Sequence, residues 1–133
     1  MPAPSIRPHW PSLIALAMTL TIAAMICWAT LTPVRAPSGL PGNDKAYHFI
    51  AFAMLSLPCA ILSPRWLVAL IPLALVFGAM IEVIQPMVGR ERELADFSAD
   101  SLGAACGAAL GIFLIRKPVL FFLRARRAKL HTD

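Results

Sequence analysis

Four long runs of apolar residues, separated by short polar segments, dominate the pattern along the chain. They cover about residues 12–31, 44–62, 66–85 and 96–115. An α-helix rises about 1.5 Å per residue, so a run of about 20 residues crosses about 30 Å of hydrocarbon. The pattern therefore predicts an all-α protein, a bundle of four transmembrane helices.

Proline, glycine and charged residues mark the ends of these runs. A loop rich in Pro and Gly covers residues 33–43, and a tight turn covers residues 63–65. Pro86 ends the third run because proline cannot continue the helical hydrogen-bond ladder, and a polar loop follows to residue 95. Residues 119–130 are typical of a short basic amphipathic helix on the membrane surface. We therefore divide the chain into an N-terminal segment, a transmembrane domain and a basic tail, residues 1–11, 12–115 and 116–133.

A cleaved signal peptide is an alternative interpretation of the first run. Val34 and Ala36 offer a small-residue cleavage site. However, Pro37 would follow the cut, and the apolar stretch exceeds the roughly 7 to 15 residues of a signal core. We therefore expect a membrane anchor.

Composition excludes an ordinary soluble domain. Hydrophobic residues make up 59 % of the chain and charged residues 14 %, against about half and about a quarter in globular domains. The mean hydropathy of +0.73 agrees. The three cysteines, Cys27, Cys59 and Cys106, lie inside apolar runs without Cys-x-x-Cys spacing, so we expect small buried side chains and no disulfide framework.

The net charge of +5 raises the question of a nucleic-acid partner, which the placement of the basic residues answers. Six of the twelve basic residues follow the last apolar run, which is typical of a cytoplasmic membrane flank. No nucleic-acid-binding module and no group of aromatic residues for base stacking accompanies them, so we expect no nucleic-acid partner. If both termini lie on the same side of the membrane, the segments on that side carry eight basic residues and the loops on the opposite side carry four. Since positive residues favour the cytoplasmic side, we expect both termini in the cytoplasm. The six tail residues are Arg116, Lys117, Arg124, Arg126, Arg127 and Lys129, the other two of the eight are Arg7 and Arg65, and the four are Arg35, Lys45, Arg90 and Arg92.

In this orientation, eight polar residues gather at the outer ends of the last three runs. Asp44 and His48 are four residues apart and share a helix face. Asp96 and Asp100 fall on one stripe with three glycines, a small-xxx-small pattern that lets another helix approach closely. The acids should therefore point into the bundle. The eight outer polar residues are Asp44, Lys45, His48, Glu82, Gln85, Arg90, Asp96 and Asp100, and the glycines are Gly103, Gly107 and Gly111.

In order and spacing, these residues form a longer pattern over 44–111. It consists of Asp44-Lys45-x-x-His48-Phe49-x-x-Phe52, then Glu82-x-x-Gln85, Gly89-Arg90, Asp96 and Asp100-x-x-Gly103-Ala104-x-x-Gly107. The pattern resembles the VanZ-like family. This resemblance implies a bacterial multi-pass inner-membrane protein, whose namesake is associated with teicoplanin resistance. It implies no established chemistry, and the resistance is not carried over to this chain.

Purely structural roles compete with functional ones. Asp44 and Asp96 stand where helix N-caps are expected. An ion pair of Glu82 with Arg90 or Lys45, with His48 and Gln85 as hydrogen-bond partners, would hold three helices together as a clasp.

Two site chemistries are the functional alternatives. In one, Lys45, His48, Arg90 and the positive ends of two helices bind an anionic headgroup. In the other, Glu82 and His48 act as catalytic base and acid. One histidine among scattered carboxylates lacks recognised ligand spacing, so we expect no metal and no other cofactor.

We therefore expect an outer-leaflet site that binds or modifies an anionic lipid or a cell-envelope intermediate. Its partner would be a membrane lipid, for example a lipid-linked envelope intermediate, in a bacterial inner membrane. The alternative is a non-enzymatic membrane scaffold or accessory subunit, in which the polar residues only hold the helices together.

Overall fold

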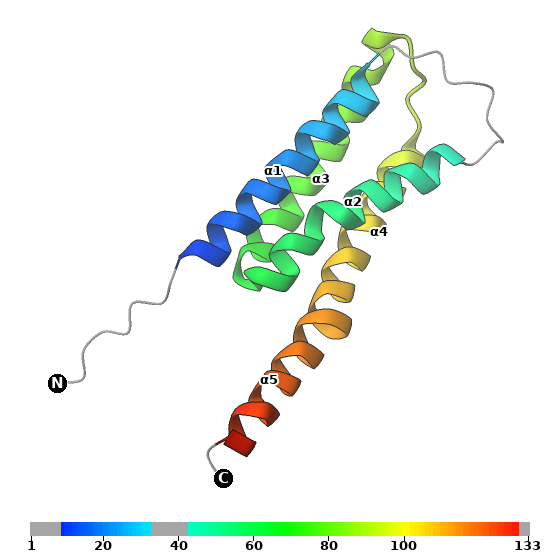
Figure 1. Cartoon of the computed structure of the whole chain (residues 1–133). Coiled ribbons are helices and arrows are strands. Elements are labelled where there is room, and N and C mark those ends of the chain that lie inside the picture. The colour runs from blue at the N-terminus through cyan, green and yellow to red at the C-terminus, as the bar shows by residue number, and fades with distance from the viewer. Residues whose placement is uncertain (1–8, 33–42, 131–133) are drawn as a thin grey trace.

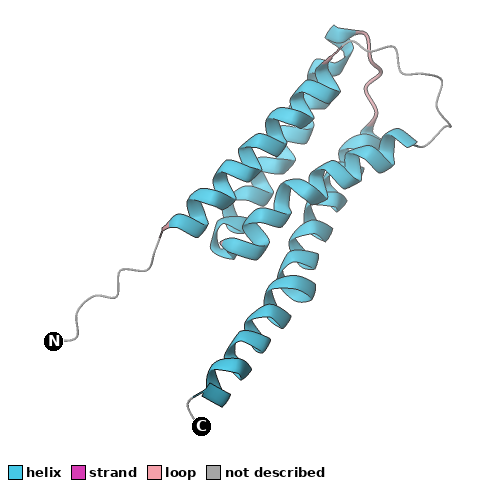
Figure 2. Cartoon of the chain, in the orientation of Figure 1, coloured by secondary structure: helices cyan, strands magenta, loops and turns pink. Residues whose placement is uncertain are grey.

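The computed structural model describes residues 9–32 and 43–130, and its regular elements in these ranges are all helices (Figures 1 and 2). Four helices are long and apolar enough to cross a membrane, and they match the four predicted runs. The all-α prediction and the four candidate spans are thus confirmed. The residues of the alternative signal-cleavage motif, Val34, Ala36 and Pro37, lie outside the described ranges. The four candidate spans are Trp10–Leu31, Asp44–Leu62, Pro64–Val88 and Leu94–Ala125.

Short turns link the second helix to the third and the third to the fourth at the predicted places. Pro86 lies in a 3₁₀ turn directly after the third helix, as the loss of its N–H requires. Gly89 then adopts a left-handed backbone conformation, with φ of 80°, and the chain turns back towards the fourth helix. The elements are α1 (Trp10–Leu31), α2 (Asn43–Leu62), η1 (Pro64–Trp66), α3 (Leu67–Ile84), η2 (Gln85–Val88), α4 (Leu94–Leu110), η3 (Gly111–Arg116) and α5 (Lys117–Leu130).

The most extensive helix contact joins α2 to α4, along the glycine stripe. A Cβ atom added at Gly103 would lie 2.2 Å from the carbonyl oxygen of Phe49, and one at Gly107 would lie 2.1 Å from that of Ala53. Only glycine permits this approach. The predicted small-xxx-small packing face is thus confirmed. Between these glycines, Ser56 Oγ donates a hydrogen bond of 2.8 Å to the carbonyl oxygen of Ala104.

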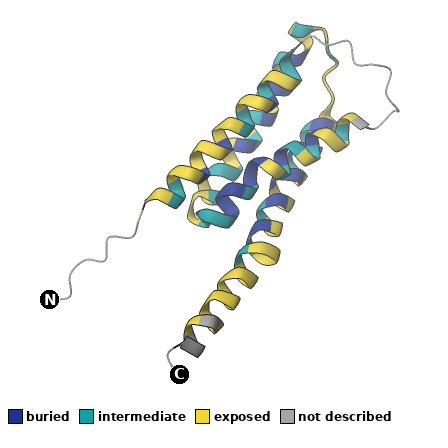
Figure 3. Cartoon of the chain, in the orientation of Figure 1, coloured by how far each residue is buried: buried dark blue, intermediate teal, exposed yellow. Residues whose placement is uncertain are grey.

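The core lies where α1, α2, α3 and α4 meet. Phe52 and Phe77 stack with ring centroids 5.7 Å apart, and Ile26 of α1 packs into the same cluster. The outward faces of the helices are exposed, as the yellow parts of the ribbon in Figure 3 show, and many of the exposed residues are large and apolar. Such an apolar exterior is typical of helices that face lipid.

The fourth candidate span continues without a break into the basic tail. The segment Leu94–Ala125 has 32 residues, about 48 Å of helix, and so exceeds the hydrocarbon thickness of about 30 Å. Its π-helical turn η3 immediately precedes Lys117 and Pro118. Because Pro118 has no N–H to offer the carbonyl four residues earlier, a local change of helical pitch is expected there. The predicted basic helix at 119–130 is therefore the end of one long rod, seen in orange and red in Figure 1.

Candidate functional site

Three helices bring five of the eight outer polar residues together below one end of the bundle. We call these five the buried polar cluster. Each is between 1 % and 4 % exposed, although all are polar. The members are His48 on α2, Glu82 on α3, Gln85 on η2, and Asp96 and Asp100 on α4. The convergence predicted from helical spacing is thus present.

His48 lies between the two aspartates of α4. Its Nδ1 is 2.9 Å from Asp100 Oδ1, a hydrogen bond in which the ring N–H donates to the carboxylate. Its Nε2 is 3.9 Å from Asp96 Oδ2. Asp100 also lies against α3, where a Cβ at Gly78 would approach its Oδ2 to 2.9 Å. The absence of a side chain at Gly78 thus makes room for the Asp100 carboxylate.

The hypothetical ion pair of Glu82 with Arg90 or Lys45 is wrong. Glu82 Oε2 instead accepts a hydrogen bond of 3.0 Å from the backbone N–H of Glu93. The reason is that residues 90–93 run from η2 back to α4 and present a backbone amide to Glu82. Lys45 pairs with the exposed Glu93 carboxylate, with Nζ and Oε2 2.6 Å apart.

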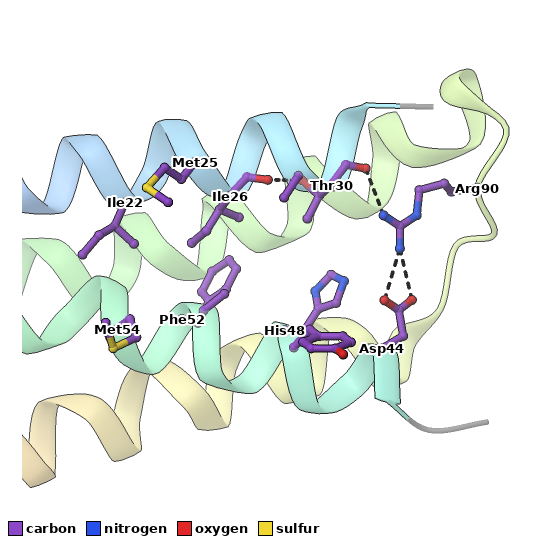
Figure 4. A pocket seen from close by; sticks show the side chains of 12 residues that line it. Ile22, Met25, Ile26, Thr30, Asp44, His48, Phe52, Met54 and Arg90 are labelled. Carbon is purple, nitrogen blue, oxygen red and sulfur yellow. Dashed lines mark hydrogen bonds and ion pairs between the residues drawn. The ribbon is translucent and has the colours of Figure 1, made fainter. Parts of the chain in front are cut away.

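Arg90 joins three segments instead. Its Nη2 donates to both carboxylate oxygens of Asp44, each at 3.2 Å, and its Nη1 reaches the carbonyl oxygen of Thr30 at 3.5 Å. Thr30 is near the end of α1 and Asp44 near the start of α2. Arg90 therefore ties the two helices together at the polar end, as Figure 4 shows.

The expectation that Asp44 and Asp96 are N-caps is also wrong. The N-cap of α4 is Glu93, without a side-chain cap hydrogen bond, because the helix begins at Leu94. Asp96 lies inside the first turn, and Asp44 follows Asn43 inside the first turn of α2. Both still benefit from the positive helix end.

The buried polar cluster is incompletely paired. Among the described residues, each member has one buried side-chain atom without a hydrogen-bond partner. A buried polar group without a partner costs free energy, about 1 to 3 kcal/mol in protein mutational data. A clasp built only for stability would be expected to use these atoms. They are His48 Nε2, Glu82 Oε1, Gln85 Nε2, Asp96 Oδ1 and Asp100 Oδ2.

Metal-ligating atoms from separate helices meet in this cluster. His48, Glu82 and Asp100 each offer one ligand atom, and these three atoms lie within 4.8 Å of one another. A second set, with Asp44 and Asp96 around His48, meets the same limit but includes an exposed residue. The sequence argument against a metal relied on spacing within one segment. It could not detect ligands that come from α2, α3 and α4.

A groove of about 600 Å³ lies beside the buried polar cluster, between α1 and α2. Most of its wall is apolar. Arg90 and Asp44 stand at one end, and His48 faces it from α2 (Figure 4). Sequence reasoning found neither the groove nor the roles of Thr30 and Glu93, because the contribution of α1 depends on tertiary packing. The lining residues are Ile22, Met25, Ile26, Ala29, Thr30, Asp44, Tyr47, His48, Ala51, Phe52, Met54 and Arg90.

Comparison of the chain with protein-family models, curated proteins and solved structures finds no match. The VanZ-like assignment therefore stays a prediction from the sequence pattern.

Proposed function

We propose that this chain is a bacterial inner-membrane protein of the VanZ-like type, whose outer-leaflet site binds or modifies an anionic lipid or a cell-envelope intermediate. The groove between α1 and α2 is the observation that carries the proposal. It combines a long apolar wall with a cationic group at one end. Ligand pockets of about 300 to 1,000 Å³ with few, well-placed polar groups are typical of small-molecule sites.

The apolar wall suits an acyl chain. Ile22, Met25 and Ile26 of α1 face Phe52 and Met54 of α2 across the groove (Figure 4). Met side chains are flexible and adapt to chains of differing shape. Both helices are candidate spans, so a lipid tail could enter from the side without crossing a polar layer.

The polar end suits an anionic headgroup. Arg90 offers a planar fork of donors that matches a phosphate as well as a carboxylate. The Asp44 side chain that now occupies this fork is 53 % exposed, so it can turn outward into water. The contact with the carbonyl of Thr30 would then hold Arg90 at the mouth of the groove.

The proposed orientation rests on the eight-to-four count of basic residues, with both termini in the cytoplasm. The polar end of the bundle then faces outward, and the basic end of the long α4–α5 rod faces the cytoplasm. There, the basic end of the rod would extend beyond the hydrocarbon to the anionic lipid headgroups, which attract its Lys and Arg side chains.

A lipid-binding experiment tests the proposal. The chain, purified in mild detergent, is exposed to phosphatidylglycerol and to phosphatidylcholine, and bound lipid is measured by native mass spectrometry. We expect a preference for phosphatidylglycerol. Arg90→Gln should weaken its binding by roughly 10- to 100-fold, since a hydrogen bond to a charged group contributes about 1.5 to 3 kcal/mol.

Because Arg90 also ties α1 to α2, a second variant acts on the groove alone. Ala29→Phe fills the groove with a ring, whereas Ala24→Phe places the same ring on an exposed part of α1 outside the lining. We expect only Ala29→Phe to lower lipid binding. Equal lipid binding by the two variants, or no preference between the two lipids, would refute the proposal.

The scaffold function is the second candidate, and the Arg90 contacts to α1 and α2 favour it. Glu82→Gln and His48→Ala separate the two functions when thermal stability in detergent is compared with lipid binding. Variants that stay folded but lose lipid binding support a site. If both variants unfold and the parent chain binds no lipid, the scaffold function is supported.

A further inference from the structure

The buried polar cluster carries an imbalance of charge. Three carboxylates, Glu82, Asp96 and Asp100, are each at most 3 % exposed. Lys45 is the nearest lysine, 3.8 Å from Asp96, but it lies closer to Glu93, at 2.6 Å. A carboxylate buried without a counter-charge is costly, and it usually pairs with a cation or coordinates a metal. Protonated His48 would add one positive charge, whereas a divalent ion adds two.

The side chains of the cluster have the chemistry of metal ligands. His48, Glu82 and Asp100 each keep one buried atom without a hydrogen-bond partner among the described residues. Each also contributes one atom to a set whose members lie within 4.8 Å of one another. Metal–ligand bonds of about 2.0 to 2.2 Å would place tetrahedral ligands roughly 3.5 Å apart. Small side-chain rotations would therefore bring this set to bonding distance.

The ligand types narrow the choice of ion. Mg²⁺ and Ca²⁺ prefer all-oxygen ligands, whereas an imidazole nitrogen with carboxylate oxygens suits Zn²⁺ and similar transition metals. His48 Nδ1 and Asp100 Oδ1 face each other at 2.9 Å, so an ion bound by both would take the place of this hydrogen bond and leave the Nε2–H of the ring directed at Asp96 Oδ2, 3.9 Å away. Carboxylates orient metal-binding histidines in this way.

We propose that His48, Glu82 and Asp100 bind a divalent transition-metal ion, with Zn²⁺ the best fit, between α2, α3 and α4. Three protein ligands leave a fourth coordination position open, as in catalytic rather than structural zinc sites. His48 also lines the groove, so a headgroup phosphate could take that position. This last consequence rests on the proposed lipid function, whereas the cation site itself does not.

Metal titration of the lipid-depleted full-length chain tests the site. After treatment with a chelator, the chain in detergent is titrated with Zn²⁺ against a chromophoric competitor. Co²⁺ then serves as a spectroscopic probe of the ligand set. We expect one equivalent of Zn²⁺ and a melting temperature that rises with its concentration, because a ligand that binds only the folded state stabilises it.

Variants assign the binding to these residues. Glu82→Gln and His48→Gln should each lower the Zn²⁺ affinity by roughly tenfold or more. Glu91→Gln removes an exposed carboxylate from the neighbouring loop and should leave the affinity unchanged. If a cluster variant unfolds, the Zn²⁺-dependent rise in melting temperature of the parent chain still decides the matter.

Two results would overturn the proposal. One is a parent chain that binds no Zn²⁺ and shows no rise in melting temperature. The other is a loss of affinity in Glu91→Gln as large as that in Glu82→Gln, which would indicate adventitious binding. Lipid binding is measured separately, so failure of the cation site leaves the groove proposal intact.

Discussion

From the close contact between α2 and α4 we predict that the Gly103→Ala variant is less stable than the parent chain. A Cβ atom at this position would lie 2.2 Å from the Phe49 carbonyl oxygen, whereas Cβ atoms essentially never come within 3.0 Å of such an atom. The obstacle is backbone, so no side-chain rotation can relieve it. The two helices would have to separate by about 0.8 Å at this level.

Two opposing effects determine how much Gly103→Ala changes the free energy of unfolding. Replacing glycine by alanine in a helix favours folding by about 0.5 to 1 kcal/mol. Overpacking a tight contact costs about 1 to 3 kcal/mol, and separation of the helices also weakens the Ser56 hydrogen bond to the Ala104 carbonyl. The steric term is larger, so we expect the free energy of unfolding to fall by about 1 to 2 kcal/mol.

Reversible unfolding in mixed detergent and SDS micelles, followed by far-UV circular dichroism, measures this loss. Ala105→Ser is the matched control, because it adds one heavy atom to an exposed position of the same helix. We expect the control to unfold like the parent chain. Equal stability of Gly103→Ala and Ala105→Ser would refute the assigned contact between α2 and α4.

Three further predictions concern two side-chain contacts and the orientation of the chain in the membrane. Ser56→Ala should lower the free energy of unfolding by about 0.5 to 1.5 kcal/mol, whereas Ser101→Ala, whose hydroxyl bonds within its own helix, should change it less in the same assay. Lys45→Met should change it by less than about 1 kcal/mol, since its pair with Glu93 is exposed. A periplasm-active alkaline phosphatase fused after residue 133 should stay inactive, and activity there would reverse the proposed orientation.

Local patterns predicted most of the fold. The first three apolar runs predicted helix limits within a few residues, because length and hydropathy are properties of each segment alone, whereas the fourth run predicted only the start of its helix, which continues past residue 115 to Ala125. The glycine stripe predicted the face of α4 that packs, since its spacing follows the helical period. The predicted boundary between the transmembrane domain and the basic tail, after residue 115, falls inside a continuous helix, because Pro118 is accommodated by a π-helical turn and does not end the helix.

Partners across the buried polar cluster were harder to predict. Helical spacing placed the polar residues at the same depth, but the conformation of the loop decided which of them pair. Arg90 reaches Asp44 and the carbonyl of Thr30, and the amide of Glu93 takes the Glu82 carboxylate. Contacts to a backbone amide or carbonyl do not depend on the identity of a side chain, so no sequence motif predicts them.

The contact between α2 and α4 determines both the packing of the bundle and the geometry of the buried polar cluster. Gly103 approaches the backbone at Phe49, the residue next to His48, and Asp100 lies three residues earlier on the same face of α4. The close approach therefore also sets the contact of 2.9 Å between His48 and Asp100. A Cβ at Gly111 would instead meet the Cβ of Ala60, about three helical turns below His48 and Asp100. Widening the bundle at Gly103 should thus disturb the buried polar cluster as well as the fold, whereas widening it at Gly111 should disturb the fold alone.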